Sequence, residues 1–205
     1  MKRVTVLLLS AIGLVAAPAM SQTGRGSWEL SLAGNLGSYS ISTEITSGGH
    51  TTSNDGESHG YLGLDLRTGW YLADGLSIEP EIYYLAVEKE PPTFNLGANL
   101  NYTFTIPQSP VKPFIIAGYG VGNGIPLMQR LLGRTSDNLD IPVLRIGCGL
   151  KVFFSKQVAF KIEYRYERYS YENTTTFYSY SYTGKEVWDY HNVLFGFSVF
   201  LPVGD

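Results

Sequence analysis

The sequence predicts an all-β fold, an eight-stranded antiparallel up-and-down transmembrane β-barrel. First, eight stretches of the chain alternate apolar with polar residues at a period of two, which is the side-chain period of a β-strand. Second, one row of each stretch is continuously apolar, while the other holds mainly glycine, asparagine and charged residues. A barrel in lipid turns its apolar row outward and its polar row inward, whereas a soluble barrel does the reverse. Third, the connections between the stretches alternate between long and short.

The hairpin over residues 142–169 shows the pattern most fully. Its first arm ends at Phe154 and its second begins at Val158, with a three-residue turn between them. In both arms every second residue is apolar or aromatic. We expect these rows to face lipid and the opposite rows to face the barrel interior. The expected inward charges of this hairpin are Arg145, Lys151, Lys161, Glu163, Arg165 and Glu167.

Six further stretches complete the barrel. With the hairpin, the expected strands cover residues 28–39, 62–72, 76–86, 94–106, 113–122, 142–154, 158–169 and 191–201. Asp74-Gly75, between the second and third stretches, is typical of a tight hairpin turn. Pro80 lacks the backbone donor that a ladder needs, so we expect a β-bulge near it. In the fifth stretch we expect the glycine row that includes Gly118 to face inward, where glycine relieves crowding.

Long connections are expected on one side of the barrel and short ones on the other. The long ones cover residues 42–58, 123–140 and 170–186, with residues 88–93 as a shorter member. Residues 42–58 are polar, rich in glycine and without periodicity, which indicates an exposed loop. The short connections are at Asp74 and over residues 107–112 and 155–157. This plan places both chain ends on the side of the short turns.

The first 19 residues have the features of a secretory signal peptide. Two basic residues precede an apolar run, and Ala17-Pro18-Ala19 fits the small-x-small pattern that signal peptidase cleaves. The run is shorter than the roughly 20 residues that a spanning helix needs. We expect cleavage after Ala19, with Ser21 as the alternative, and one barrel domain over residues 20–205. Loss of the two basic residues changes the formal net charge from −3 to −5, and this mild acidity argues against nucleic acid as a partner.

The signal segment, the eight alternating stretches and the final strand NVLFGFSVFL resemble the small OmpA/OmpX-type outer-membrane β-barrel proteins over the whole mature chain. The resemblance implies export to the bacterial outer membrane, with long loops outside the cell and short turns in the periplasm. It implies contacts with outer-membrane lipid, with lipopolysaccharide and with the outer-membrane assembly machinery. Chains of this kind commonly end on an aromatic residue, whereas here Leu201 closes the apolar row and four residues follow it. We expect a structural role or an adhesion-like role of the long loops toward an extracellular ligand, with no cofactor.

The expected inward rows contain six acids and five bases. This near balance predicts a mutually neutralising network, because an eight-stranded barrel leaves an interior that side chains roughly fill. The alternative is a narrow porin-like channel gated by an interior Arg/Glu pair. The interleaved bases favour structural pairing over acid/base catalysis by the carboxylates. The eleven residues are Glu29, Asp65, Arg67, Glu79, Glu81, Arg145, Lys151, Lys161, Glu163, Arg165 and Glu167.

A lipid A-modifying barrel enzyme is a further interpretation. Barrels that deacylate lipid A carry a His-x-Ser-Asn-like motif on a late strand. In the corresponding segment ERYSYEN only Ser170 matches, and the histidine is missing. A serine without an adjacent base is a weak nucleophile, so we expect no enzymatic activity. His50, His59 and His191 have no metal-ligand spacing with carboxylates or with Cys148, so we expect no metal site.

Two groups of aromatic residues stand out. The first lies toward strand ends or on the apolar rows, where girdles form at the membrane interfaces: Trp28, Trp70, Tyr84, Tyr102, Tyr164 and Tyr166. The second lies among serine and threonine in the last long loop, a composition that adaptable binding surfaces use: Tyr171, Tyr178, Tyr180 and Tyr182. We expect the second group either to contact a ligand or to extend the girdle and cover the barrel mouth.

Overall fold

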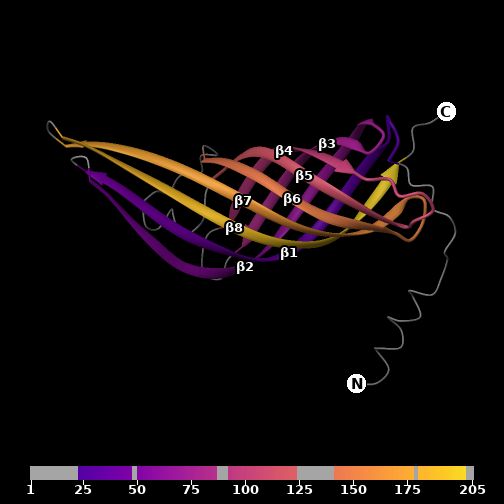
Figure 1. The fold of residues 1–205 in the computed structure, drawn as a ribbon, viewed down its shortest axis with the longest axis horizontal. Coiled ribbons are helices and arrows are strands. Elements are labelled where there is room, and N and C mark those ends of the chain that lie inside the picture. Colours follow the sequence, from indigo (N-terminus) through magenta and orange to yellow (C-terminus); the bar gives the residue numbers. More distant parts are fainter. Residues whose placement is uncertain (1–22, 48–49, 87–91, 124–140, 178–179, 202–205) are drawn as a thin grey trace, which may run out of the picture.

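The computed structural model describes residues 23–47, 50–86, 92–123, 141–177 and 180–201. No helix in these residues is long and apolar enough to cross a membrane. Eight antiparallel strands form a closed barrel in which each strand pairs with the next along the chain and the last pairs with the first (Figure 1). The predicted fold class is therefore confirmed.

The strands fall into two length classes. Four have 11 to 13 residues: β3 (Leu76–Ala86), β4 (Thr93–Thr103), β5 (Val111–Gly122) and β6 (Ile141–Phe153). The other four have 20 to 24 residues: β1 (Trp28–Ser47), β2 (His50–Ala73), β7 (Val158–Phe177) and β8 (Tyr180–Leu201). The long strands are neighbours in the closed barrel, because β8 pairs with β1.

Burial alternates along the barrel strands with a period of two. In β4 the outward Leu100 is 54 % exposed, while the adjacent inward Asn101 is fully buried. In β5 the inward row contains Gly118 together with Phe114 and Ile116, so the row is apolar at one end and glycine at the other. The apolar rows face outward and the charged rows inward, which is the arrangement expected for a barrel in lipid.

The two ends of the barrel differ. We call the end that holds the Asp74-Gly75 turn and residues 104–110 and 154–157 the turn end, and the opposite end the loop end. Gly75 has a φ of 76°, the left-handed conformation that glycine adopts readily in a tight turn. Residues 23–27 lie against the turn end, where the Gly75 N–H donates to the Thr23 carbonyl at 2.9 Å. The N-terminal segment that precedes β1 is thus held to the barrel.

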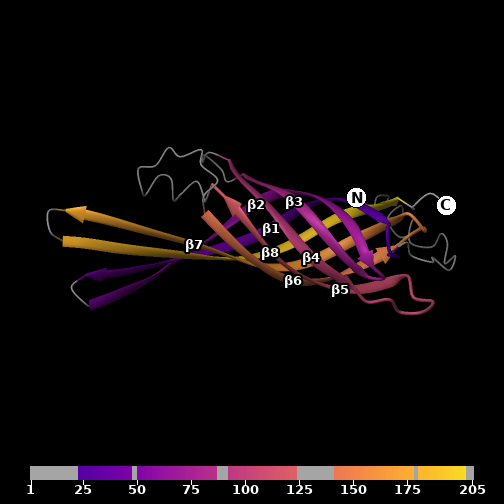
Figure 2. The ribbon, with the colours of Figure 1, turned by 90° about the horizontal axis from the view of Figure 1, so that it is seen from above.

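At the loop end the four long strands continue past the other four as one sheet. β1 pairs with β2 up to Ser47 and His50, and with β8 up to Thr46 and Thr183. β7 and β8 remain paired up to Phe177 and Tyr180. We call residues 38–47, 50–60, 170–177 and 180–190 the outer sheet. Figures 1 and 2 show its two hairpins reaching beyond the rest of the barrel on one side.

The outer sheet corrects two sequence-based predictions. Residues 42–58 and 170–186 were expected as loops, but all of their described residues continue the strand ladders except Gly56 and Glu57, which form an irregularity opposite Ile41. Period-two patterning arises where one sheet face meets lipid and the other meets the lumen, so it disappears beyond the barrel although the ladder continues. Serine, threonine and tyrosine side chains are compatible with strands there. Residues 124–140 and 87–91, which make up most of the other predicted loops, lie outside the described residues.

The expected bulge near Pro80 is absent. The register between β2 and β3 is the same on both sides of Pro80, and the ladder between β3 and β4 runs through it without interruption. Instead, two residue pairs of the β2–β3 ladder are not formed, at the place where Pro80 has no N–H to donate. The register shift in this ladder lies between Tyr71 and Ala73, next to the turn.

Candidate functional site

The barrel lumen is the candidate site, because every charged residue predicted to face inward lies there. All eleven side chains belong to residues with 0–3 % exposure. Sequence reasoning missed Lys112, which is 4 % exposed and also faces inward at the start of β5. It was assigned to a turn, although it continues the inward row of Phe114 and Ile116. Among the described residues the buried charges therefore balance at six acids and six bases.

Two arginines form the centre of the lumen. Arg67 from β2 contacts Asp65 at 2.6 Å and Glu163 at 2.8 Å. Arg165 from β7 contacts Glu163 at 2.7 Å and Asp65 at 3.2 Å. It also reaches Glu81 on β3 at 2.8 Å. The two guanidinium groups thus share carboxylates from three strands, so the network ties opposite walls of the barrel together. Buried ions require such pairing because their desolvation is costly.

Nearer the loop end, Arg145 lies against a wall of glycine. Its Nε donates to Glu167 at 2.7 Å, and its terminal nitrogens have no hydrogen-bond partner among the described residues. A side chain at Gly97 or Gly120 would overlap the guanidinium group. Inward glycines in β4 and β5 therefore make the space that a buried arginine occupies, consistent with the predicted relief of crowding.

At the turn end a lysine is surrounded by aromatic rings. Lys151 Nζ donates to Glu29 at 2.6 Å and lies 5.4–5.8 Å from the ring centroids of Tyr71, Phe114 and Phe200. The Tyr71 hydroxyl donates to the same carboxylate at 2.7 Å. Charge pairing, cation–π contact and ring packing together fill this end of the lumen.

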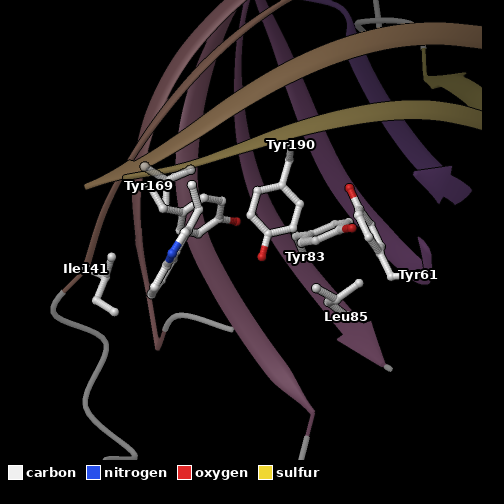
Figure 3. Close-up of a cluster of buried hydrophobic side chains, with 8 residues drawn as sticks. Tyr61, Tyr83, Leu85, Ile141, Tyr169 and Tyr190 are labelled. Atoms are coloured by element: carbon white, nitrogen blue, oxygen red, sulfur yellow. The ribbon is translucent and has the colours of Figure 1, made fainter. Parts of the chain in front are cut away.

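At the loop end the lumen is covered by a cluster that we call the aromatic cap (Figure 3). Its rings come from different strands, and Tyr190 packs against Tyr61 and Tyr169 at centroid distances of 5.4 and 4.9 Å. The Asn35 amide donates to the Tyr83 hydroxyl at 2.8 Å. The members of the cap are 0–7 % exposed: Tyr61, Tyr83, Leu85, Ile141, Val143, Tyr169, Trp188 and Tyr190.

The predicted loop tyrosines are distributed differently from expectation. Tyr171 belongs to β7 and is partly buried against the aromatic cap. Tyr180 and Tyr182 belong to β8, within the outer sheet. Tyr178 lies outside the described residues. The aromatic residues predicted for the girdles all lie on outward rows, and Trp28 stacks on Trp70 with 6.0 Å between ring centroids.

Other candidate chemistry is sparse. Within the described ranges, no group of three or more His, Cys, Asp or Glu residues is arranged to hold a metal ion. Ser170 pairs with Val187, whereas His191 pairs with Tyr166, four positions earlier on β7. Cys148 is exposed on the outward row of β6.

The family follows from comparison with known proteins. The family model described as "Outer membrane protein beta-barrel domain" matches residues 7–199, nearly the whole chain. The chain belongs to this outer-membrane β-barrel family. The match agrees with the closed barrel, its outward apolar rows and its inward charges. A search of curated proteins found no matching sequence.

Solved structures of outer-membrane barrels share this fold. The chain resembles OprG from Pseudomonas aeruginosa, with 14 % identity and a TM-score of 0.50 over 88 % of this chain and 99 % of that one. It resembles Neisserial surface protein A with 16 % identity and a TM-score of 0.49 over 82 % and 97 %. The outer-membrane enzyme PagL aligns with 16 % identity and a TM-score of 0.32 over 74 % and 97 %. At these identities the likeness shows the fold alone.

Proposed function

We propose that this outer-membrane barrel has a sealed lumen and works through its outer sheet, which it presents to an extracellular ligand. The observation that supports the proposal most is the continuation of β1, β2, β7 and β8 past the other strands as one hydrogen-bonded sheet. A barrel that serves only as an anchor does not require the nine further residue pairs between β1 and β2 or the eight between β7 and β8. The proposed role is adhesion-like and non-enzymatic.

The filled lumen supports this role over that of a channel. Water reaches almost none of the surface of the central charges, of the aromatic cap or of the rings around Lys151. A conducting path would have to separate several buried ion pairs and displace rings at both ends. Each separated buried pair leaves an uncompensated charge, which typically costs about 3–5 kcal/mol.

The orientation follows from the signal segment and from the barrel plan. We propose export through a cleaved signal peptide, with cleavage after Ala19, although residues 1–22 lie outside the described part of the chain. The turn end then faces the periplasm and the loop end faces the exterior, as short turns and long hairpins do in such barrels. Lipopolysaccharide and the assembly machinery remain the expected partners of the barrel wall.

Trimming the outer sheet tests the proposal. One variant replaces residues 39–59 by Asn-Gly, because Ser38 and Gly60 are opposite each other, and residues 171–186 by Asn-Gly between Ser170 and Val187. We expect bacteria producing the full chain to adhere to cultured epithelial cells more than bacteria producing the trimmed barrel. Heat-modifiable gel mobility of the outer-membrane fraction verifies that both variants are folded and in place.

A second variant separates the surface from the scaffold. It keeps the full length of the outer sheet and replaces Tyr180 and Tyr182 by serine. If the tyrosines contact the ligand, this variant loses adherence as the trimmed barrel does. Equal adherence of the full chain and the trimmed barrel would contradict the proposed function.

A further inference from the structure

A group of polar and aromatic side chains lies on the outward, membrane-facing side of β7 and β8. We call it the β7–β8 polar cluster: Tyr164, Tyr166, Arg168, Asp189 and His191. Arg168 holds Asp189 in a two-pronged contact, with Nε to Oδ1 at 2.7 Å and Nη2 to Oδ2 at 3.0 Å. The Tyr166 hydroxyl donates to Asp189 Oδ1 at 2.6 Å.

The other half of the cluster is built on His191. The Tyr164 hydroxyl lies 2.8 Å from His191 Nδ1. The two rings are nearly parallel, 26° apart, with their centroids 6.2 Å apart, and the Tyr166 ring centroid lies 5.5 Å from that of His191. The guanidinium of Arg168 lies 5.6 Å from the Tyr166 ring centroid. Contacts on several sides hold each polar group in place, although Arg168 remains 50 % exposed and Asp189 28 % exposed.

The position of the cluster along the strands indicates which part of the membrane it faces. Toward the turn end, the same outward rows are apolar, with Ile162 on β7 and Phe195 and Val193 on β8 all exposed. On the neighbouring strand, the residues paired with Tyr166 and Arg168 are the exposed Ile146 and Leu144. On β7 and β8 the outward rows therefore change from apolar to polar at this cluster, beside apolar residues of β6, and we infer that the cluster lies near the boundary between acyl chains and lipid headgroups on the loop side. Tyrosine is enriched at this depth in membrane proteins.

The chemistry of the cluster favours a sugar over a simple anion. Arg168 and Asp189 cancel each other's charge, and the Asp189 carboxylate repels phosphate. The exposed groups offer both donors and acceptors, from a guanidinium, a carboxylate, two phenols and an imidazole. Sugar hydroxyls also donate and accept, and the apolar face of a pyranose ring packs on aromatic rings. Planar guanidinium and carboxylate groups add geometric selectivity.

We propose that the β7–β8 polar cluster binds the sugar headgroup of a membrane glycolipid in the leaflet on the loop side. The cluster lies at the base of the outer sheet, of which it includes only Asp189, and its proposed ligand differs from the extracellular ligand of that sheet. It does not depend on the adhesion-like role, but it rests on the proposed orientation of the barrel and on the proposed contact of its wall with lipopolysaccharide. Arg168 and Asp189 hydrogen-bond sugar hydroxyls, while the tyrosine and histidine rings pack against the sugar ring.

The test uses the full-length mature chain folded into phosphatidylcholine vesicles. One set contains phosphatidylcholine alone, a second adds lipopolysaccharide, a third adds phosphatidylglycerol, and a fourth adds a neutral glycosyl diacylglycerol. The measurement is the urea midpoint of unfolding, because a ligand that binds only the folded barrel raises it. We expect both sugar-bearing lipids to raise the midpoint and phosphatidylglycerol to leave it near the value in phosphatidylcholine.

Two variants assign the effect to the cluster. Tyr166→Phe and Asp189→Asn preserve shape and remove a hydroxyl or a charge, so we expect each to lose most of the increase given by the glycolipids. The matched control is Tyr119→Phe, a tyrosine that is 60 % exposed on β5 and paired with Leu144, which in turn pairs with Arg168. It should retain the full increase.

Three results would overturn the proposal. An increase with phosphatidylglycerol equal to the increase with the glycolipids would show that charge, rather than sugar, is recognised. An unchanged increase in both cluster variants would place the binding elsewhere on the barrel. An equal loss in Tyr119→Phe would indicate a general effect of interfacial tyrosines. Should Asp189→Asn fail to fold, Tyr166→Phe alone decides, because it removes one hydroxyl from an outward side chain.

Discussion

Arg165 on β7 reaches across the lumen to Glu81 on β3, with 2.8 Å between Nη1 and Oε1. These strands are four apart in the closed barrel, so the contact joins opposite walls. The same guanidinium also contacts Glu163 and Asp65. One side chain therefore neutralises carboxylates from three strands.

Replacing Arg165 by methionine should destabilise the barrel by about 3–5 kcal/mol, because it leaves buried carboxylates without their counter-charge. Urea unfolding in phosphatidylcholine vesicles, followed by heat-modifiable gel mobility, measures the change. Glu172→Gln is the control, since Glu172 is an exposed acid on the same strand. A loss in Arg165→Met no larger than in this control would mean that the network contributes little.

The inward glycines give a second prediction. A methyl group at Gly120 would overlap the backbone carbonyl of Leu96 as well as Arg145, whereas at Gly34, on the outward row of β1, the nearest atom is 3.8 Å away. Gly120→Ala should therefore cost about 1–3 kcal/mol, the range for overpacking a filled interior. Gly34→Ala should be nearly neutral in the same unfolding assay. Equal stability of the two variants would show that the lumen has spare room beside β5.

The lipid-facing assignment of the outward rows predicts that the cost of an arginine substitution depends on its depth in the bilayer. Leu150 and Ile162 pair with each other across β6 and β7, and both face outward. Arginine at either position should cost about 2–4 kcal/mol if it meets the bilayer midplane, and about 0–1 kcal/mol near an interface. Phe154→Arg, at the turn end, is the interfacial comparison. Arginine at Leu150 that costs no more than at Phe154 would contradict the inside–outside assignment.

The outer sheet predicts a specific cross-link. Thr46 on β1 and Thr183 on β8 are opposite each other, and residues opposite each other in antiparallel strands have Cα atoms about 4.5–5.5 Å apart. This separation suits a disulfide, so cysteines at both positions in a Cys148→Ser background should oxidise to an intrachain bond. Mass spectrometry of protease digests detects it. Thr46→Cys with Thr176→Cys, whose β8 partner is Ser181, should not cross-link. Equal cross-linking of both pairs would mean that these hairpins do not form a fixed sheet.

The sequence was sufficient to predict the barrel because lipid and lumen impose opposite chemistry on alternate residues of every strand. The row of Leu100 and the row of Asn101 illustrate this, and the eleven inward charges follow from the same rule. Residues 42–58 and 170–186 were predicted wrongly because that rule stops where the strands leave the barrel. Lys112 was missed because proline and polar residues before it indicated a turn.

The contacts within the site needed the structure. Alternation places Arg165 and Glu81 on inward rows, but only the strand order and register show that they meet across the lumen. The aromatic cap combines residues from five different strands that no local pattern links. The β7–β8 polar cluster likewise depends on the pairing of Tyr166 with His191 and of Arg168 with Asp189.

Single-channel recording in planar lipid bilayers tests the sealed lumen most directly. The full-length mature chain, folded in detergent and inserted at low protein concentration, should give no steady conductance, because ion pairs fill the centre and rings cover both ends. Heat-modifiable mobility of the same preparation verifies that folded barrels were inserted. Steady conductance steps that change in size on Arg165→Met or Glu81→Gln would contradict the account and would make the channel the function of this barrel.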